Sequence, residues 1–400
     1  MSTLDLRNDI SDSVNLILED IDQHFKKIDC IGFYELFEFV SKIIKDIYEF
    51  PDDLIVFKTI QDVLLKDKCE NVDVDELRNT VIELEKIPLP AQRTPEWFDF
   101  RLTRITASDL ASVLNLGKYA RRFEVLKTKI TGIMNYSPNK YTIHGTKYEP
   151  IATSAYEIRN KTSVIEFGCL PHPVYKELGA SPDGITPDGI MLEIKCPYSR
   201  EIKGYPPIYY WTQMQLQLEV ADLHCCDFLE INIREYETKE DYIEDTDISG
   251  KLSKKYNLEK GIVIVILKAD GSEDYRYINF NQDITKQMTE AKEIINKLID
   301  ENNEEHSGFV EKYFYFQKYS CIRIYRDTFW FNSILEDVYD FWDEVDEYKK
   351  LGIEQHPKYR QKKPKKTSAN PIQDYQQKKT LEFIQKFYGD KCLLDTDSDE

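Results

Sequence analysis

The stretch LGASPDGITPDGIMLEIKCP, residues 178–197, constrains the fold more than any other part of the sequence. Its two Pro-Asp-Gly segments have the composition of turns that reverse the chain between strands. In a strand, side chains two residues apart lie on the same side, so Glu193 and Lys195 share one face while the residues between and beside them are apolar. The stretch therefore predicts a hairpin in a sheet with at least one buried face.

The predicted hairpin places a second carboxylate near this pair. We expect the reversal to bring Asp183 beside Glu193, whereas Asp188 lies too close to Glu193 to pair across the hairpin and is interpreted as a turn residue. Two carboxylates and a lysine against apolar neighbours favour Mg²⁺, with the lysine positioning a water or helping to deprotonate it. The alternative is an exposed Glu193–Lys195 ion pair beside ordinary turns.

Strand-like and helical runs alternate through most of the chain, which predicts an α/β (α+β) fold with a central sheet flanked by helices. The strand-like runs cover residues 163–170, 190–196, 226–236, 261–269, 275–280 and 313–327. The helical runs cover residues 14–25, 33–50, 108–116, 121–130, 209–222, 282–302 and 333–350.

Charge and proline content divide the chain into three parts. Residues 1–91 carry 10 Lys and Arg against 21 Asp and Glu, which indicates an acidic helical domain over 1–90. The proline-rich segment 87–95 has the composition of a linker, because proline disfavours helix. A central domain over 91–352 and a mobile charged tail over 353–400 complete the prediction.

Composition excludes several classes of protein. The eight cysteines lack the spacing of a zinc site or a disulfide scaffold and are interpreted as reduced packing residues. No run of 18 apolar residues is present and the first residues do not resemble a secretion signal, so we expect an intracellular protein with no membrane contact.

The net charge of −19 is unevenly distributed, because residues 93–147 carry 10 Lys and Arg against 4 Asp and Glu. We interpret this stretch as a surface for a polyanion such as DNA, against the alternative of a solvated helix face. The candidate phosphate contacts in it are Arg104, Lys118, Arg121 and Arg122.

Asp183, Glu193 and Lys195, in SPDG and LEIKCP, match the PD-(D/E)xK nuclease signature. Three further motifs accompany it in order: RTPEWFDFRLTRITASDLASVL, HGTKYEPIATSAYE and YYWTQMQLQLEV. Together they make residues 92–235 similar to the phage lambda exonuclease and YqaJ-type viral recombinase family. This resemblance implies a restriction-endonuclease-like mixed sheet flanked by helices, with the N-terminal helical domain as an addition.

The resemblance also implies roles for individual residues. Glu149, Asp183, Glu193 and the backbone carbonyl of Ile194 would bind metal, with Lys195 and Gln213 as further catalytic groups. Arg101, Ser108 and Ser181 would bind the 5′-phosphate of a DNA end, a role that suits guanidinium and hydroxyl groups. Gln215 is a second candidate DNA contact beside Gln213, although on a helix the two lie on different faces.

The expected activity is that of a Mg²⁺-dependent exonuclease, with two ions and with Mn²⁺ able to substitute, which degrades duplex DNA from its ends in the 5′ to 3′ direction for recombination, repair or replication. The family further implies a single-strand annealing partner, a homo-trimer and the cytoplasm or nucleus of an infected host. Two alternatives stay open: a structure-specific or nicking endonuclease on the same fold, and an inactive DNA-binding or scaffold protein.

Overall fold

The structure is a computed structural model that describes residues 3–24, 33–49, 51–66, 69, 72–90, 92, 94–133, 139–301 and 305–359. Residues as far as Ile353 form one compact unit, and a second unit begins at Glu354. Most of the predicted tail, with its KKPKK segment, lies outside the described residues. Within those residues, none of the helices has the length and apolar character needed to cross a membrane.

Three helices and a short π-helical turn open the chain: α1 (Thr3–His24), α2 (Phe33–Ile47), α3 (Asp53–Gln61) and η2 (Asp62–Lys66). They bury an apolar face against the rest of the unit, where the Phe33 ring stacks on that of Trp211 with 5.7 Å between centroids. The Tyr34 hydroxyl donates to the Pro206 carbonyl at 2.9 Å. The acidic N-terminal part is thus helical, as predicted, and it packs on the segment that carries the glutamine motif.

The helices before the main sheet are α5 (Val74–Glu85), α6 (Pro95–Leu102), α7 (Ala107–Val113), α8 (Arg122–Thr131) and α9 (Lys140–Asn160). The helices that follow the first strands of the main sheet in the sequence are α10 (Ile208–Ala221), α11 (Lys239–Glu244), α12 (Ile284–Asp300), α13 (Thr328–Ser333), α14 (Leu335–Leu351) and the 3₁₀ turn η3 (Ile353–Gln355). The described part of the predicted linker between α5 and α6 has no regular secondary structure.

The main sheet has the order β4-β5-β6-β9-β7-β8. Its strands are β4 (Gly184–Ile185), β5 (Met191–Lys195), β6 (Cys225–Glu235), β7 (Lys260–Lys268), β8 (Glu273–Tyr277) and β9 (His306–Tyr325). A smaller sheet joins β1 (Ile105–Thr106), β3 (Leu178–Ala180) and β2 (Leu170–Pro171). Since β5 and β6 run parallel and the other pairs are antiparallel, the main sheet is mixed, as predicted.

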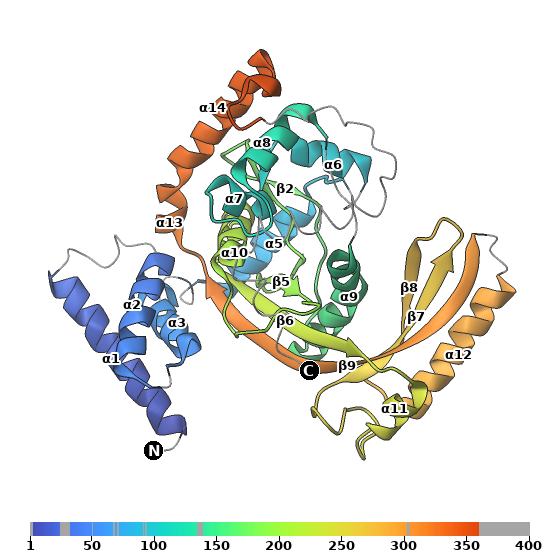
Figure 1. Cartoon of the computed structure of the whole chain (residues 1–400). Coiled ribbons are helices and arrows are strands. Elements are labelled where there is room, and N and C mark those ends of the chain that lie inside the picture. The colour runs from blue at the N-terminus through green and yellow to red at the C-terminus, as the bar shows by residue number, and fades with distance from the viewer. Residues whose placement is uncertain are drawn as a thin grey trace, which may run out of the picture. The chain divides into compact units, whose positions relative to one another are not determined.

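Helices cover the two faces of the sheet at β5 and β6, with α9 on one side and α10 on the other (Figure 1). The apolar side chains of Leu192 and Ile194 join a buried cluster with Tyr148 and Ile151 of α9. The alternate residue Glu193 points to α10. The period of two in MLEIK thus separates an apolar face from a polar one, as the sequence predicted.

The strand predicted at residues 163–170 is largely wrong. In that range only Ile165, in an isolated bridge to Ile185, and the first residue of β2 pair as strand. The intervening carbonyl of Phe167 instead accepts a hydrogen bond from Gln92 at 2.7 Å. Contacts with the segment that precedes α6 therefore replace a β-ladder along this run.

Candidate active site

The site begins at the hairpin of β4 and β5, which pairs Gly184 with Leu192 and Ile185 with Met191. This register puts Asp183 opposite Glu193, as predicted. The Asp183 carboxylate (Oδ2) accepts a hydrogen bond from the Ile194 backbone N–H at 2.6 Å, so the side chain folds onto the edge of β5. Asp188 lies at the exposed turn and pairs with Arg78 of α5 at 2.8 Å, which confirms that it serves the turn.

Glu193 is fully buried, and hydrogen bonds fix both of its carboxylate oxygens. Oε1 contacts the Lys195 ammonium and accepts a hydrogen bond from Gln213 at 2.7 Å. Oε2 accepts one from Gln217, also at 2.7 Å. A buried carboxylate needs such partners, because an unpaired charge in the interior is costly. The arrangement holds one carboxylate in a single orientation at the sheet surface.

Helix α10 supplies both amides because positions four apart lie on the same side of a helix. Gln217 had no assigned role in the sequence prediction, and its i+4 spacing from Gln213 is the signal that identifies it. Gln215 points elsewhere: it is buried, donates to the Tyr325 carbonyl at 3.0 Å and accepts from the Asp327 N–H at 2.7 Å. The prediction of Gln215 as a DNA contact is therefore wrong.

Charge repulsion shapes the electrostatics of the site. Burial and the neighbouring charges of Glu193 and Glu149 raise the pKa of Asp183 well above its usual range, although Lys195 opposes this. Burial lowers the pKa of Lys195, but the charges of Glu193 and Asp183 outweigh that effect and raise it overall. The charge of Glu149, from α9, thus acts on Asp183, but the described residues do not bring the three predicted acids together as one metal-binding group.

The donor set suits a hard divalent cation in its chemistry. Among the described residues, no group of three or more His, Cys, Asp and Glu is gathered as a ready-made metal site. Magnesium is often bound through one or two carboxylates, with water and substrate phosphate completing its shell. Asp183 and Glu193 provide two such groups. Burial and the nearby charge of Glu193 raise the pKa of Asp183, and a bound cation would reduce this repulsion between the two carboxylates.

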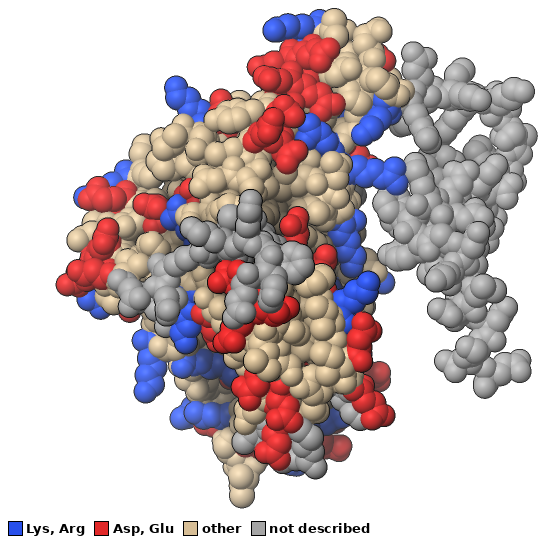
Figure 2. Space-filling view, turned by 90° about the vertical axis from the view of Figure 1, so that its left-hand side faces the viewer, with Lys and Arg blue, Asp and Glu red and all other residues tan. Residues whose placement is uncertain are grey.

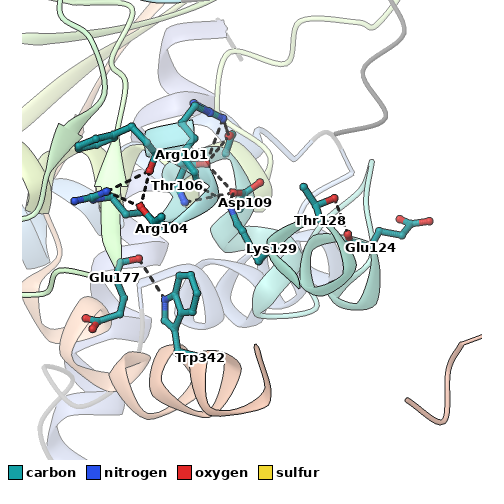
Figure 3. A network of polar contacts seen from close by, with 12 residues as sticks. Arg101, Arg104, Thr106, Asp109, Glu124, Thr128, Lys129, Glu177 and Trp342 are labelled. Carbon is teal, nitrogen blue, oxygen red and sulfur yellow. Dashed lines mark hydrogen bonds and ion pairs between the residues drawn. The ribbon is translucent and has the colours of Figure 1, made fainter. Parts of the chain in front are cut away.

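A second polar cluster lies at the start of α7 (Figure 3). The Arg101 guanidinium donates to the hydroxyls of Ser108 at 3.0 Å and Thr106 at 3.3 Å. Its plane lies 4.3 Å from the centre of the Trp97 ring, which fixes the guanidinium from its other face. Arg101 and Ser108, predicted to bind a terminal phosphate, thus meet side by side.

A buried ion pair supports this cluster from beneath. The Lys129 ammonium, with only 4% of its side chain exposed, donates to the Asp109 carboxylate at 2.7 Å and to the Arg101 carbonyl at 2.9 Å. The same oxygen of Asp109 accepts from the Thr106 hydroxyl at 2.8 Å. Backbone and side chain of Arg101 are therefore tied into one network.

Ser181 lies near the buried thiol of Cys169, and among the described residues its hydroxyl has no hydrogen-bond partner. Burial raises the pKa of this thiol, whereas Ser181, Arg101 and Arg104 beside it act in the opposite direction. The Ser181 carbonyl also accepts a hydrogen bond from Gln217 at 3.3 Å. Ser181 thus lies near both Cys169 and Gln217, and its binding of a terminal phosphate stays a prediction.

Two of the predicted phosphate-contacting arginines have structural partners instead. Arg122 pairs with Glu344 of α14 at 3.0 Å and donates to the Val113 carbonyl at 3.0 Å, so its guanidinium has partners within the chain and its contact with DNA stays a prediction. Arg104 lies 3.7 Å from the centre of the Phe100 ring and donates to that residue's carbonyl at 3.2 Å. Its guanidinium is thus largely engaged, while Arg121 is exposed and stays a prediction.

Acidic and basic side chains are both exposed on the face drawn in Figure 2. On the face drawn in Figure 2, the described residues carry separate groups of acidic and basic side chains. Acidic groups therefore lie beside basic ones on that face. Binding of a polyanion would depend on local arrangement, such as that of Arg101 and Ser108, more than on the net charge of −19.

Comparisons with known proteins agree with the four motifs. Residues 96–224 match the YqaJ-like viral recombinase domain. An uncharacterized protein of Acanthamoeba polyphaga mimivirus is 36% identical over 226 residues, which cover 51% of this chain and 41% of that protein. A protein of African swine fever virus (strain Badajoz 1971 Vero-adapted) is 27% identical over 163 residues, or 33% of this chain and 47% of its own. The chain thus spans less than half the length of these relatives.

Among solved structures, an alkaline exonuclease from Laribacter hongkongensis aligns with 64% of this chain and 95% of its own, at 24% identity and a TM-score of 0.40. The family model covers α6 to α10 and contains both clusters described above, from Arg101 to Gln217. The resemblance predicted from the motifs is therefore confirmed: residues 96–224 match the YqaJ-like viral recombinase domain.

Proposed function

We propose that this chain is a metal-dependent deoxyribonuclease that removes nucleotides from the 5′ end of duplex DNA. The observation that supports it most is the meeting of Asp183, Glu193 and Lys195 at one hairpin, with both oxygens of Glu193 held by hydrogen bonds. An exposed ion pair beside ordinary turns does not need a fully buried glutamate with two dedicated amide donors. Such a site also argues for an enzyme over a scaffold protein.

Each residue of the site has its own proposed role. Asp183 and Glu193 would hold Mg²⁺, or Mn²⁺ in its place, with Glu149 and the Ile194 carbonyl as further ligands if a second ion binds. Such an ion would neutralise charge on the scissile phosphate and lower the pKa of a bound water. Gln213 and Gln217 orient Glu193, and Lys195 holds a proton at its Nζ beside that carboxylate.

The cluster of Arg101 and Ser108 is the reason to favour an enzyme that starts from ends. Its guanidinium and hydroxyl groups are the donors that a terminal phosphate monoester prefers. Holding the terminal phosphate would set the position of the next phosphodiester in the site. The resemblance further suggests an annealing partner, a homo-trimer and a viral role within host cells, which belong to the same proposal.

The test compares three substrates of equal sequence in Mg²⁺: linear duplex with a 5′-phosphate, linear duplex with a 5′-hydroxyl and closed circular duplex. The proposal expects fast loss of the first, slower loss of the second and persistence of the third. Equal cleavage of the circular substrate would replace the exonuclease by an endonuclease. No cleavage of any substrate, with DNA binding intact, would favour the inactive DNA-binding protein.

A further inference from the structure

A group of aromatic and basic side chains lies beside the candidate active site. It consists of Lys118, Tyr119, Tyr209 and Tyr210, and we call it the tyrosine shelf. The Tyr119 and Tyr209 rings meet edge to face with 5.5 Å between their centroids. The centroids of the Tyr209 and Tyr210 rings are 4.5 Å apart. The Lys118 ammonium lies 5.7 Å from the Tyr119 ring centre and 5.9 Å from that of Tyr209.

The shelf lies beside Lys195 in space and follows, in the sequence, the helix that carries Ser108. Tyr210 lies under the Lys195 ammonium, 4.9 Å from its ring centre. Tyr119 follows α7, the helix that begins beside Thr106 and contains Ser108. Consider a DNA strand with its 5′-phosphate at Arg101 and its next phosphate at Glu193. The first base of such a strand would lie near the tyrosine shelf.

Exposure separates the shelf from an ordinary core cluster. Tyr119 is 68% exposed, and Lys118 is exposed beside it. Tyr148, by contrast, is fully buried in the core of the chain. The turn before Tyr119 is tight: a side chain at Gly117 would meet the Ser112 hydroxyl at 2.4 Å and the Ala120 carbonyl at 2.8 Å. Tyr119 thus follows a closely packed turn and is itself exposed.

We infer that the tyrosine shelf binds a nucleobase of the DNA strand, at the nucleotide whose 5′-phosphate lies at Arg101. The occupant is a base because an aromatic face stacks on any of the four bases, and because the neighbouring, exposed Lys118 favours a phosphate-bearing ligand. This site would hold the terminal nucleotide while its 3′-phosphodiester meets the carboxylates, and it would contribute little sequence preference. The inference rests on the proposed function.

The test uses duplex DNA with 2-aminopurine as the 5′-terminal base, bound in Ca²⁺ by the full chain carrying Glu193→Gln. Fluorescence of 2-aminopurine falls when the base stacks. We expect quenching by the parent, retention of quenching by Tyr119→Phe, and its loss in Tyr119→Leu together with an affinity about 5- to 100-fold weaker, as expected for one stacked base. With 2-aminopurine ten positions inside the duplex, the two variants should agree.

A matched control is available at Tyr141, which is 54% exposed and has the Lys140 ammonium 5.2 Å from its ring centre, near Tyr198. Tyr141→Leu should quench like the parent. If Tyr119→Leu quenches normally, or if Tyr141→Leu abolishes quenching instead, the inference is overturned. These outcomes differ from a failure of the proposed function, in which the unmodified chain would leave all three DNA substrates intact in Mg²⁺.

Discussion

The carboxylate of Asp183 and the backbone N–H of Ile194 meet at 2.6 Å, eleven residues apart in the chain. This bond holds the carboxylate at the edge of β5, next to the face on which Glu193 and Lys195 lie. It explains how two acids that repel each other stay together, since the backbone donor compensates part of the cost of burial. The hairpin alone thus places Asp183 beside Glu193, without contacts from distant elements.

We predict that Gln217→Leu lowers kcat by about 10- to 100-fold, because a hydrogen bond to a charged group contributes about 1.5–3 kcal/mol and its loss leaves Glu193 Oε2 without that donor. Single-turnover cleavage of a 5′-phosphorylated duplex measures the effect. Gln215→Leu is the matched control: its bonds go to the backbone at Tyr325 and Asp327, so it should lower stability and leave kcat of the folded protein near normal. A larger kcat effect from Gln215 would contradict the assignment.

For Arg101 the prediction concerns substrate preference. Arg101→Ala should reduce the ratio of kcat/KM for 5′-phosphate over 5′-hydroxyl ends by about 10- to 100-fold, the worth of a charge-assisted hydrogen bond. Arg101→Lys keeps the charge but loses the planar fork, so it should fall in between. An unchanged ratio in Arg101→Ala would place the terminal phosphate elsewhere.

The ion pair beneath Arg101 predicts a pH dependence of stability. Burial raises the pKa of Asp109, but Lys129 and Arg101 outweigh it and hold the pKa below the usual value of 3.8. The unfolded chain therefore binds the proton first as pH falls, so this stabilisation is present above about pH 4 and is lost below it. Urea unfolding between pH 3 and 7 measures the slope.

Asp109→Asn should flatten that slope and cost about 3–5 kcal/mol at pH 7, because it leaves the buried Lys129 charge without its counter-ion. Lys129→Met, which removes the charge itself, should cost less than Asp109→Asn. If both variants unfold with the wild-type pH dependence, Asp109 does not titrate as described.

The N-terminal helices should stabilise the part of the chain that carries the site. Phe33→Ala removes a fully buried ring that stacks on Trp211 of α10, and we expect a loss of about 3–5 kcal/mol in the free energy of unfolding. Phe39→Ala, on the same helix but 54% exposed, should change it by less than about 0.5 kcal/mol. Equal effects of the two changes would mean that α2 does not pack on α10 in this way.

Those features of the site that depend on local sequence could be predicted. Turn composition and the period of two in MLEIK sufficed to place Asp183 beside Glu193, because hairpin register follows from the turn. The side of α10 that meets the sheet depends on packing, so among three similar glutamines Gln215 was wrongly included and Gln217 was missed.

Features that depend on contacts between segments distant in the sequence could not be predicted. Arg122 looked like a free cation because its partner Glu344 lies 222 residues away in the sequence. The run at 163–170 has strand-like composition, yet most of it has no strand beside it, and composition does not reveal which neighbours a segment will find. The helical N-terminal part was predicted, but its packing against Trp211 was not.

The most direct test of the account measures Mg²⁺-dependent release of nucleotides from a linear, 5′-phosphorylated duplex by the wild-type chain, Glu193→Gln and Asp188→Asn. Glu193 lies at the centre of the site, whereas Asp188 is an exposed carboxylate in the same hairpin. The account predicts release by the wild-type chain and by Asp188→Asn, and a loss of at least about 100-fold in Glu193→Gln with DNA binding in Ca²⁺ preserved. Wild-type rates in Glu193→Gln would contradict it.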